Sequence, residues 1–317
     1  MDFQINYDVK INEFDLFIDQ FKADLCGMGL QEVITGSMVN REWIEKISPK
    51  KLTSIFNPIS KDLDGLRNSL IPSLVQVVQF NRNRKTGDLK LFEINRVFHA
   101  PEDLEKQPHE EVHLGIAFCG NRDGALWNSS HKPVDFFDIR GFVEAICDKI
   151  SLDNWDFISY SDSYIQEGGA ALRIGGKIIG ILGRLHDQLQ NIFELDEDVY
   201  IAELNVSPLY NSRNTIKKYQ PIPKFPGIER DLALIIAEDV EAEKLVKKIQ
   251  ERAGKLLNQI EIFDIYRGKQ IPDGKKSLAF RLVFQSGERT LTEEEINSLI
   301  KKIYEGVQES FQAKLRE

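Results

Sequence analysis

The sequence predicts an α+β protein of two domains: an antiparallel sheet with helices on one side, followed by a smaller four-stranded domain. Three observations carry this prediction. The chain has 317 residues, more than one small domain usually needs. Helical and strand-like patterns are mixed without the regular alternation of a parallel α/β protein. Four of the 11 prolines lie between residues 205 and 227, so we expect an extended linker over residues 206–226.

The first domain, residues 1–205, is expected to open with an amphipathic helix. Five large apolar side chains recur there at three- and four-residue spacing, and Gly27 and Gly29 end the pattern. This apolar stripe is wider than a small surface helix should leave in water, so we expect it to contact a partner. Its members are Phe14, Phe17, Ile18, Phe21 and Leu25.

Two further helices are expected in this domain. One covers residues 66–78, with Pro72 in the first turn of its main segment. The other covers residues 139–150, with Asp138 as its cap. The expected strands are residues 30–39, 89–98, 112–119 and 171–183.

The second domain, residues 227–317, has a clearer pattern of six elements in the order strand, helix, strand, strand, helix, strand. Thr292 and Glu295 have the spacing of a capping box at the start of the last helix. This order is the ferredoxin-like split βαβ arrangement. The elements are expected at residues 231–237, 241–252, 259–267, 277–285, 292–311 and 313–316.

Composition excludes several classes of protein. The net charge of −9 argues against a chain that coats DNA or RNA by bulk attraction. Residues 224–317 hold 17 basic and 17 acidic side chains, so residues 1–223 carry the whole negative charge. No apolar run approaches the roughly 18–20 residues of a membrane helix. The chain has only three cysteines, and no two of them have the spacing of metal ligands: Cys26, Cys119 and Cys147. This favours a reduced, cytoplasmic protein.

One local motif suggests a zinc protease. His109, Glu110 and His113 satisfy the pattern of two histidines four apart with a glutamate after the first. That pattern works on a helix, yet Pro108 precedes it and strand-like alternation follows. On a strand, residues four apart are roughly 13 Å apart, too far for one ion. We therefore expect no metal site, and a metalloprotease is the weakest alternative.

Two other patterns have structural explanations. The glycine-rich run at 175–184 lacks the ending of a phosphate-binding loop, and a hairpin at Gly175–Gly176 explains it. Asp135, Asp138 and Glu144 resemble an acidic cluster, but helix capping accounts for them. No catalytic residue is expected.

The strongest functional pattern lies in the second domain. Two helices can cover only one face of a four-stranded sheet, and the strand period of two places Phe263 and Ile265 on the covered face. The open face then combines an aromatic ring with polar groups, which suits unstacked RNA bases, although an ordinary solvated face is the alternative. The side chains expected there are Asp264, Tyr266, Ser277 and Arg281. The candidates for phosphate contacts are Arg230, Arg267 and Arg281.

Taken together, these stretches resemble a known family. Residues 230–233, 263–268, 276–280 and 289–295 look like the ferredoxin-fold anticodon-binding domain of phenylalanyl-tRNA synthetase. Upstream stretches are similar to the beta chain of the bacterial enzyme. These are residues 57–60, 66–74, 91–98 and 135–138.

The resemblance implies that the first domain adopts a class II synthetase-like fold. In this family the module is catalytically silent and packs against the alpha chain, which carries the active site. The sequence agrees, because Arg96 is followed by Phe98 where a working site needs a glutamate for ATP. Arg184 stands where family beta chains usually carry glutamate, so we do not expect it to bind ATP.

The resemblance also implies partners. The parent enzyme uses ATP and Mg²⁺ to join phenylalanine to its tRNA, and it assembles as a heterotetramer of two alpha and two beta chains. We expect phenylalanine tRNA and the alpha subunit as partners, and no membrane, no DNA and no cofactor in this chain. Family beta chains carry further amino-terminal domains, including an editing domain, so we expect a carboxy-terminal piece. The alternatives are a free-standing class II-like ATP-dependent ligase and an RNA-binding protein of another kind.

Overall fold

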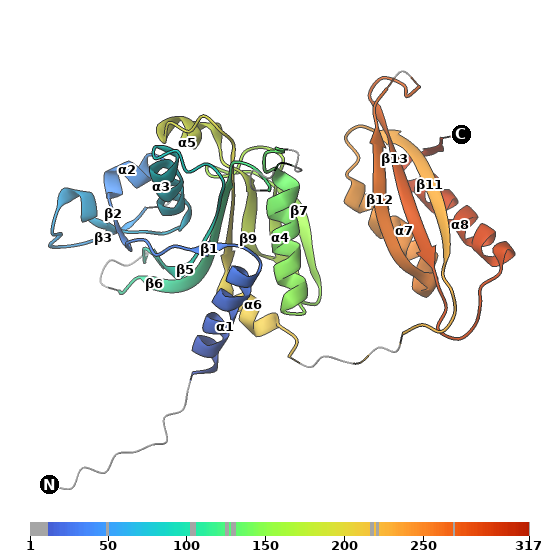
Figure 1. The fold of residues 1–317 in the computed structure, drawn as a ribbon, viewed down its shortest axis with the longest axis horizontal. Helices are drawn as coiled ribbons and strands as arrows, with labels where there is room; N and C mark the ends of the chain where they lie inside the picture. The colour runs from blue at the N-terminus through green and yellow to red at the C-terminus, as the bar shows by residue number, and fades with distance from the viewer. Residues whose placement is uncertain are drawn as a thin grey trace, which may run out of the picture. The chain divides into compact units, whose positions relative to one another are not determined.

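The computed structural model describes residues 12–48, 51–101, 106–123, 127, 131–215, 219, 222–268 and 270–316. The chain divides into two compact units, residues 1–217 and residues 218–317 (Figure 1). Within the described residues, no helix combines the length and the apolar composition needed to cross a membrane.

The first unit is built on a seven-stranded sheet in the order β1-β5-β6-β10-β9-β8-β7. Neighbouring strands are antiparallel except β1 and β5, which run parallel at one edge. The strands are β1 (Gln31–Glu32), β5 (Leu89–His99), β6 (His109–Cys119), β7 (Trp155–Tyr160), β8 (Gly169–Ile174), β9 (Lys177–Arg184) and β10 (Val199–Asn205).

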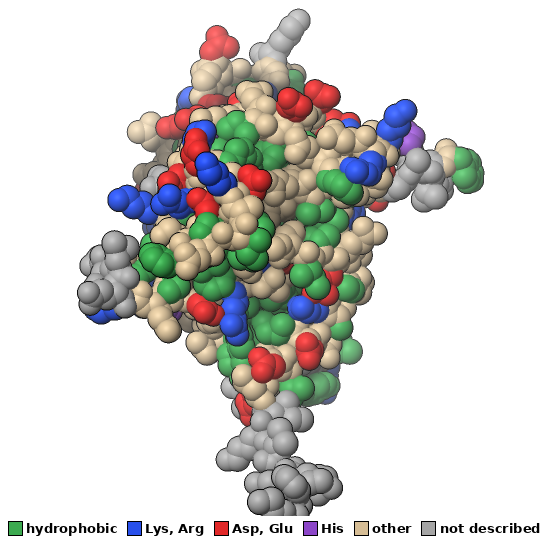
Figure 2. All heavy atoms as spheres, turned by 90° about the vertical axis from the view of Figure 1, so that its left-hand side faces the viewer, with side chains coloured by type: hydrophobic (Ala, Val, Ile, Leu, Met, Phe, Trp, Pro, Cys, Tyr) green, Lys and Arg blue, Asp and Glu red, His purple; other side chains and the backbone are tan. Residues whose placement is uncertain are grey.

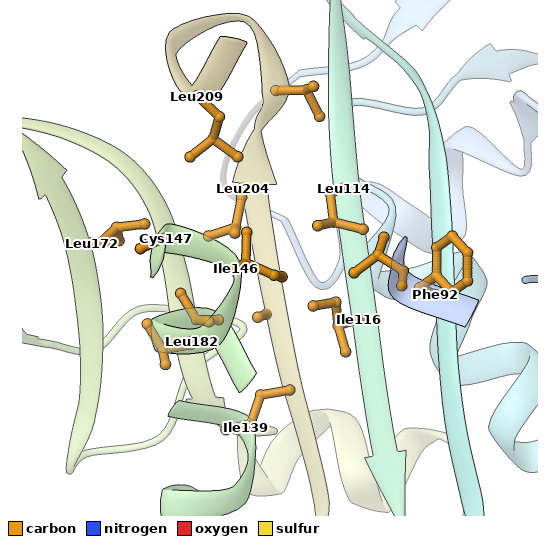
Figure 3. Close-up of a cluster of buried hydrophobic side chains, with 14 of the residues drawn as sticks. Phe92, Leu114, Ile116, Ile139, Ile146, Cys147, Leu172, Leu182, Leu204 and Leu209 are labelled. Carbon is orange, nitrogen blue, oxygen red and sulfur yellow. The ribbon is translucent and has the colours of Figure 1, made fainter. Parts of the chain in front are cut away.

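Helices cover both faces of this sheet, which corrects the expectation of helices on one side. Leu91 and Phe92 are neighbours in β5, yet they belong to two different hydrophobic cores. Both faces of the central strands are therefore apolar and both need cover. Helices α1 (Glu13–Gly27), α4 (Phe136–Lys149) and α6 (Val206–Ser212) contribute to one core, which Figure 3 shows from Leu172 across to Phe92. Helices α2 (Arg41–Glu45), α3 (Ile71–Arg82) and α5 (Asp187–Ile192) contribute to the other.

A small three-stranded sheet lies beside the large one. It consists of β2 (Met38–Val39), β3 (Thr53–Ser54) and β4 (Gly65–Leu66), in the order β2-β4-β3. A 3₁₀ helix, Lys61–Leu63, precedes β4. Just after β4, the buried Arg67 side chain pairs with Glu93 of β5 at 3.1 Å, which ties the two sheets together.

Helix starts follow local capping rules. Pro72 lies in the first turn of α3, as predicted. Helix α4 begins earlier than expected because Asp135 is its N-cap, and Asp138 completes a capping box from the third helical position. The expected hairpin between β8 and β9 is confirmed, since Gly175 and Gly176 have φ of 55° and 81° at its turn.

Residues 206–212, which the sequence analysis places in the extended linker, instead form α6. The Asn205 side chain accepts a hydrogen bond from the Ser207 amide at 3.0 Å and caps the helix. Pro208 is tolerated because amides of a first helical turn have no partner within the helix. Val206 and Leu209 are buried in the first unit's core, so this segment packs with the first unit.

The second unit has the predicted element order and the split βαβ arrangement. Its sheet has the order β12-β13-β11-β14, with all neighbours antiparallel. Thr292 and Glu295 form the predicted capping box. The α+β fold class is therefore confirmed. The elements are β11 (Ile228–Ala237), α7 (Ala242–Ala253), a 3₁₀ turn (Gly254–Leu256), β12 (Leu257–Tyr266), β13 (Lys275–Phe284), α8 (Glu293–Phe311) and β14 (Lys314–Leu315).

Candidate nucleic-acid interface

The second unit leaves one face of its sheet without helices. Along β13, alternate side chains enter the core beneath α7 and α8, and the intervening ones lie on the opposite face. We call that opposite face the open face. The core side chains of β13 are Leu278, Phe280, Leu282 and Phe284.

A β-bulge in β12 changes which side chains reach the open face. Ile262 pairs with Phe280 and Asp264 pairs with Ala279, so Phe263 is the extra residue between them. The bulge resets the alternation. Phe263 lies against Arg281, whose guanidinium carbon is 4.9 Å from the ring centre. The expectation that Phe263 lies on the covered face is wrong for this reason.

Three of the predicted base-contacting residues come together. Tyr266 is the cross-strand partner of Ser277, and Asp264, which is exposed, is the partner of the next open-face position, Ala279. The Ser277 side chain is 1% exposed. Its hydroxyl has no hydrogen-bond partner among the described residues. A buried hydroxyl without a hydrogen-bond partner lowers the stability of the fold, unless a ligand supplies the missing hydrogen bond.

Arg316 is a member of this face that the sequence analysis missed. Its guanidinium carbon lies 4.3 Å from the centre of the Tyr266 ring. The Arg316 amide donates to the Ala233 carbonyl at 3.0 Å, which continues the pairing of β14 with β11. The ferredoxin-like order of elements places the carboxy-terminal strand beside the first strand of this unit. That order is the feature of the sequence from which the position of Arg316 could have been predicted.

The three candidate phosphate-binding arginines each pair with a carboxylate. Arg281 contacts Asp231 at 3.1 and 3.3 Å. The hydrogen bond to Asp231 raises the pKa of Arg281. The remaining pairs are Arg267 with Glu238 at 2.8 Å and Arg230 with Glu293 at 3.5 Å. Their charges are already compensated, which makes them weaker phosphate ligands than the sequence suggested.

The first unit contains a cavity of about 610 Å³ over the sheet. Its wall includes three carboxylates, those of Glu111, Asp162 and Glu203. No lysine or arginine is among the described residues that line it. A nucleoside triphosphate needs cationic ligands, so this wall does not fit ATP.

The two arginines considered for ATP lie elsewhere. Arg96 pairs with Glu110 at 3.0 Å. Arg184 lies between Asp187 and Asp198, at 2.7 Å from each. The hydrogen bond to Asp198 raises the pKa of Arg184. Neither side chain lines the cavity.

Histidines and carboxylates form a chain along the cavity. His113 bonds Glu203 through Nδ1 and Glu111 through Nε2, each at 3.0 Å. Glu203 also accepts from the Ser69 hydroxyl at 2.6 Å and the Leu70 amide at 2.9 Å. Burial favours neutral His113, but its hydrogen bonds to the two carboxylates outweigh burial and raise the pKa of its imidazole.

The apolar stripe of α1 packs mostly inside the chain. Phe21 and Leu25 are 2% and 0% exposed and belong to the first unit's core, so they are wrong as interface residues. Phe14 and Phe17 are half-buried, with ring centres 5.1 and 5.2 Å from that of Tyr210. Ile18 is also half-buried against the core. The apolar stripe of α1 is wider than that of a free surface helix because α6, a helix absent from the sequence-based prediction, covers part of it.

Comparison with known families now bears on both units. Residues 6–206 match the model of the phenylalanyl tRNA synthetase beta chain CLM domain. Residues 223–316 match the model of the ferredoxin-fold anticodon binding domain. The chain belongs to the phenylalanyl-tRNA synthetase beta chain family. The family resemblance found in the sequence is thereby confirmed.

Curated relatives carry the same family name. The phenylalanine–tRNA ligase beta subunit of Symbiobacterium thermophilum is 35% identical over 89% of this chain and 32% of its own length. That of Listeria innocua is 34% identical over 93% of this chain and 37% of its own length. The chain thus spans about a third of the length of these beta chains. A solved pyrrolysyl tRNA synthetase from Desulfitobacterium hafniense aligns with a TM-score of 0.48 at 12% identity, over 62% of this chain and 65% of that one.

Proposed function

We propose that this chain is part of a phenylalanine–tRNA ligase beta subunit, and that its second unit binds the tRNA anticodon. The observation that carries the proposal is the grouping of Asp264, Tyr266 and Ser277 on the open face, within the segment that matches the anticodon-binding family. Phenylalanine tRNA is the RNA that the family name implies.

Each of these side chains has a distinct task in this proposal. The Tyr266 ring offers a surface on which an unstacked base can lie. Asp264 repels phosphate, so its carboxylate contributes by accepting hydrogen bonds from base amino or imino groups. The unpaired Ser277 hydroxyl adds a donor and an acceptor. Phe263 extends the aromatic surface because the bulge turns it outward.

The first unit, in our proposal, is a catalytically silent scaffold. Its cavity presents carboxylates where a triphosphate would need cations. ATP and Mg²⁺ then belong to the active site of the alpha subunit in the assembled enzyme. The wall of this cavity does not fit ATP, and we derive no step of the reaction through it.

We further propose that the first unit contacts the alpha subunit, within a heterotetramer of two alpha and two beta chains. Phe56 and Ile59, between β3 and β4, are 95% and 87% exposed. Ile34 and Met38 are also exposed near β2, and Figure 2 shows hydrophobic side chains among charged ones on this side. Large apolar side chains left in water in this number are typical of an interface. The half-buried Phe14, Phe17 and Ile18 stay candidates beside them.

A cytoplasmic location fits this assignment. Cys26, Cys119 and Cys147 are all free thiols, as a reducing compartment allows. Translation, which consumes aminoacylated tRNA, takes place in that compartment.

The test is binding of phenylalanine tRNA to variants of the intact enzyme. Tyr266→Ala should weaken binding about 5- to 150-fold, because base stacking is worth about 1–3 kcal/mol. Tyr219→Ala, which removes an exposed ring outside the sheet, is the matched control. Asp264→Asn should change the preferred anticodon more than the overall affinity. Wild-type binding by Tyr266→Ala would place the RNA surface elsewhere.

A further inference from the structure

Three donor side chains gather at the edge of the cavity. His99 ends β5 opposite His109, and Glu111 and His113 follow His109 on the same face of β6. One ligand atom from each of His99, Glu111 and His113 lies within 4.8 Å of the other two. This cluster differs from the rejected protease pattern, because it joins His113 to His99 on the neighbouring strand rather than to His109.

Two of the three distances between the donor atoms are close to the edge of a tetrahedral metal site, and the third is within 4.8 Å. The Glu111 Oε2 atom lies 3.2 Å from His99 Nε2 and 3.0 Å from His113 Nε2. With metal–ligand bonds of about 2.0–2.1 Å, the edge of a zinc tetrahedron is about 3.3 Å. These two edges therefore need to change by only a few tenths of an ångström.

A second carboxylate orients one of the ligands. His113 Nδ1 bonds the buried Glu203, which in turn is fixed by Ser69 and the Leu70 amide. This leaves His113 Nε2 as the nitrogen that faces Glu111. A carboxylate behind a ligating histidine is the usual support of zinc-bound imidazoles.

The charge of the cavity favours a cation. Glu111, Asp162 and Glu203 line it, and the described wall has no lysine or arginine to compete. The side chains of His99 and Glu111 are about 30% exposed and that of His113 14%, so the cluster is partly desolvated yet reachable from the cavity.

We propose that His99, Glu111 and His113 bind one Zn²⁺ ion at the edge of the cavity. Two imidazoles and one carboxylate are a recurrent zinc ligand set, and the fourth position faces the cavity, where water or a small anion completes the tetrahedron. The two imidazole nitrogens are borderline donors, which favour Zn²⁺ over Mg²⁺, a cation that prefers six oxygen ligands.

The test is titration of the untagged, chelator-treated chain with Zn²⁺. Calorimetry measures the binding, and thermal unfolding measures the shift of the midpoint temperature. We expect one ion per chain, a rise in the unfolding midpoint with Zn²⁺ and none with Mg²⁺. Co²⁺ should give the intense visible absorption of a tetrahedral site. His99→Ala should weaken binding by at least about tenfold, since even an outer partner of a ligating histidine is worth about 10- to 100-fold.

Two further variants complete the experiment. His131→Ala removes an exposed histidine outside the cluster and should bind Zn²⁺ like wild type. Glu203→Gln should weaken binding about 10- to 100-fold if Glu203 supports the ligand His113. If either His113→Ala or Glu203→Gln unfolds the chain, His99→Ala still tests the site, because the His99 ring is only partly buried. Absence of saturable binding in the micromolar range, or equal binding by His99→Ala and wild type, would overturn the proposal.

Discussion

The Arg316 guanidinium lies over the Tyr266 ring, with 4.3 Å between its central carbon and the ring centre. The two residues belong to opposite edges of the sheet, since β12 and β14 are its outer strands. Their contact therefore crosses the open face. This cation–π interaction holds the Tyr266 ring in place. At an exposed site such an interaction is worth about 0.5–1 kcal/mol.

Arg316→Ala should weaken binding of phenylalanine tRNA about two- to fivefold, because the ring loses this support. The loss should be the same for intact and altered anticodons, since Arg316 acts through the ring. Lys314→Ala removes an equal charge from β14, two residues earlier in the chain, and is the control. Tighter binding by Arg316→Ala would mean instead that the guanidinium competes with the base.

Ser277→Ala should separate stability from function. Removing a buried hydroxyl without a partner should leave the free energy of unfolding unchanged or raise it by about 1 kcal/mol. The same change should weaken tRNA binding, because the base loses a hydrogen-bonding group. Urea unfolding and tRNA titration measure the two quantities. A clear loss of stability would show that the hydroxyl has a structural partner.

Glu295 makes the second unit sensitive to acid. Its hydrogen bonds to Arg289 and to the Thr292 amide lower the pKa of Glu295 to about 2. The native state therefore gains stability from the ionised carboxylate above its unfolded pKa of about 4.3, and loses it as pH falls towards 2. Wild type should exceed Glu295→Gln in stability at pH 6, and the difference should shrink between about pH 4.3 and 2.

Glu294→Gln, on the same exposed turn, changes the net charge equally and is the control for this comparison. An NMR titration of the Glu295 carboxyl gives its midpoint directly. A midpoint above pH 4 would contradict the prediction.

The isolated chain should not activate phenylalanine. The described lining of its cavity offers no lysine or arginine for an ATP triphosphate, so phenylalanine-dependent exchange of pyrophosphate into ATP should equal that of a blank. Exchange that copurifies with the chain through several steps, and is absent from a mock preparation of the host, would revive a free-standing ligase.

Much of the second unit was predictable because its signals are local. The capping box of Thr292 and Glu295 and the alternation along β13 are properties of short segments. Phe263 was misplaced because a bulge depends on how two strands pair, which no single strand encodes. Arg316 was missed for the same reason, since its position follows from the pairing of β14 with β11.

The first unit was predicted less well, and the errors have a common origin. The four prolines between residues 205 and 227 predict a linker, but residues 206–212 form α6 because Asn205 caps the helix and its apolar side chains pack into the core. Phe21 and Leu25 were assigned to a partner because their own covering helix was unknown. The cluster of His99 with His113 needs the register of β5 and β6, which sequence spacing along one strand does not supply.

The pairing of Arg230, Arg267 and Arg281 with carboxylates has a consequence for the kinetics of RNA binding. A surface whose positive charges are paired with carboxylates attracts RNA only weakly at long range. We therefore expect an association rate constant near the value without electrostatic steering, about 10⁵–10⁶ M⁻¹s⁻¹. Salt should then alter the association rate only weakly. Discrimination between tRNAs then depends mainly on the dissociation rate of each complex. A wrong RNA that dissociates quickly leaves the surface free to bind the next tRNA.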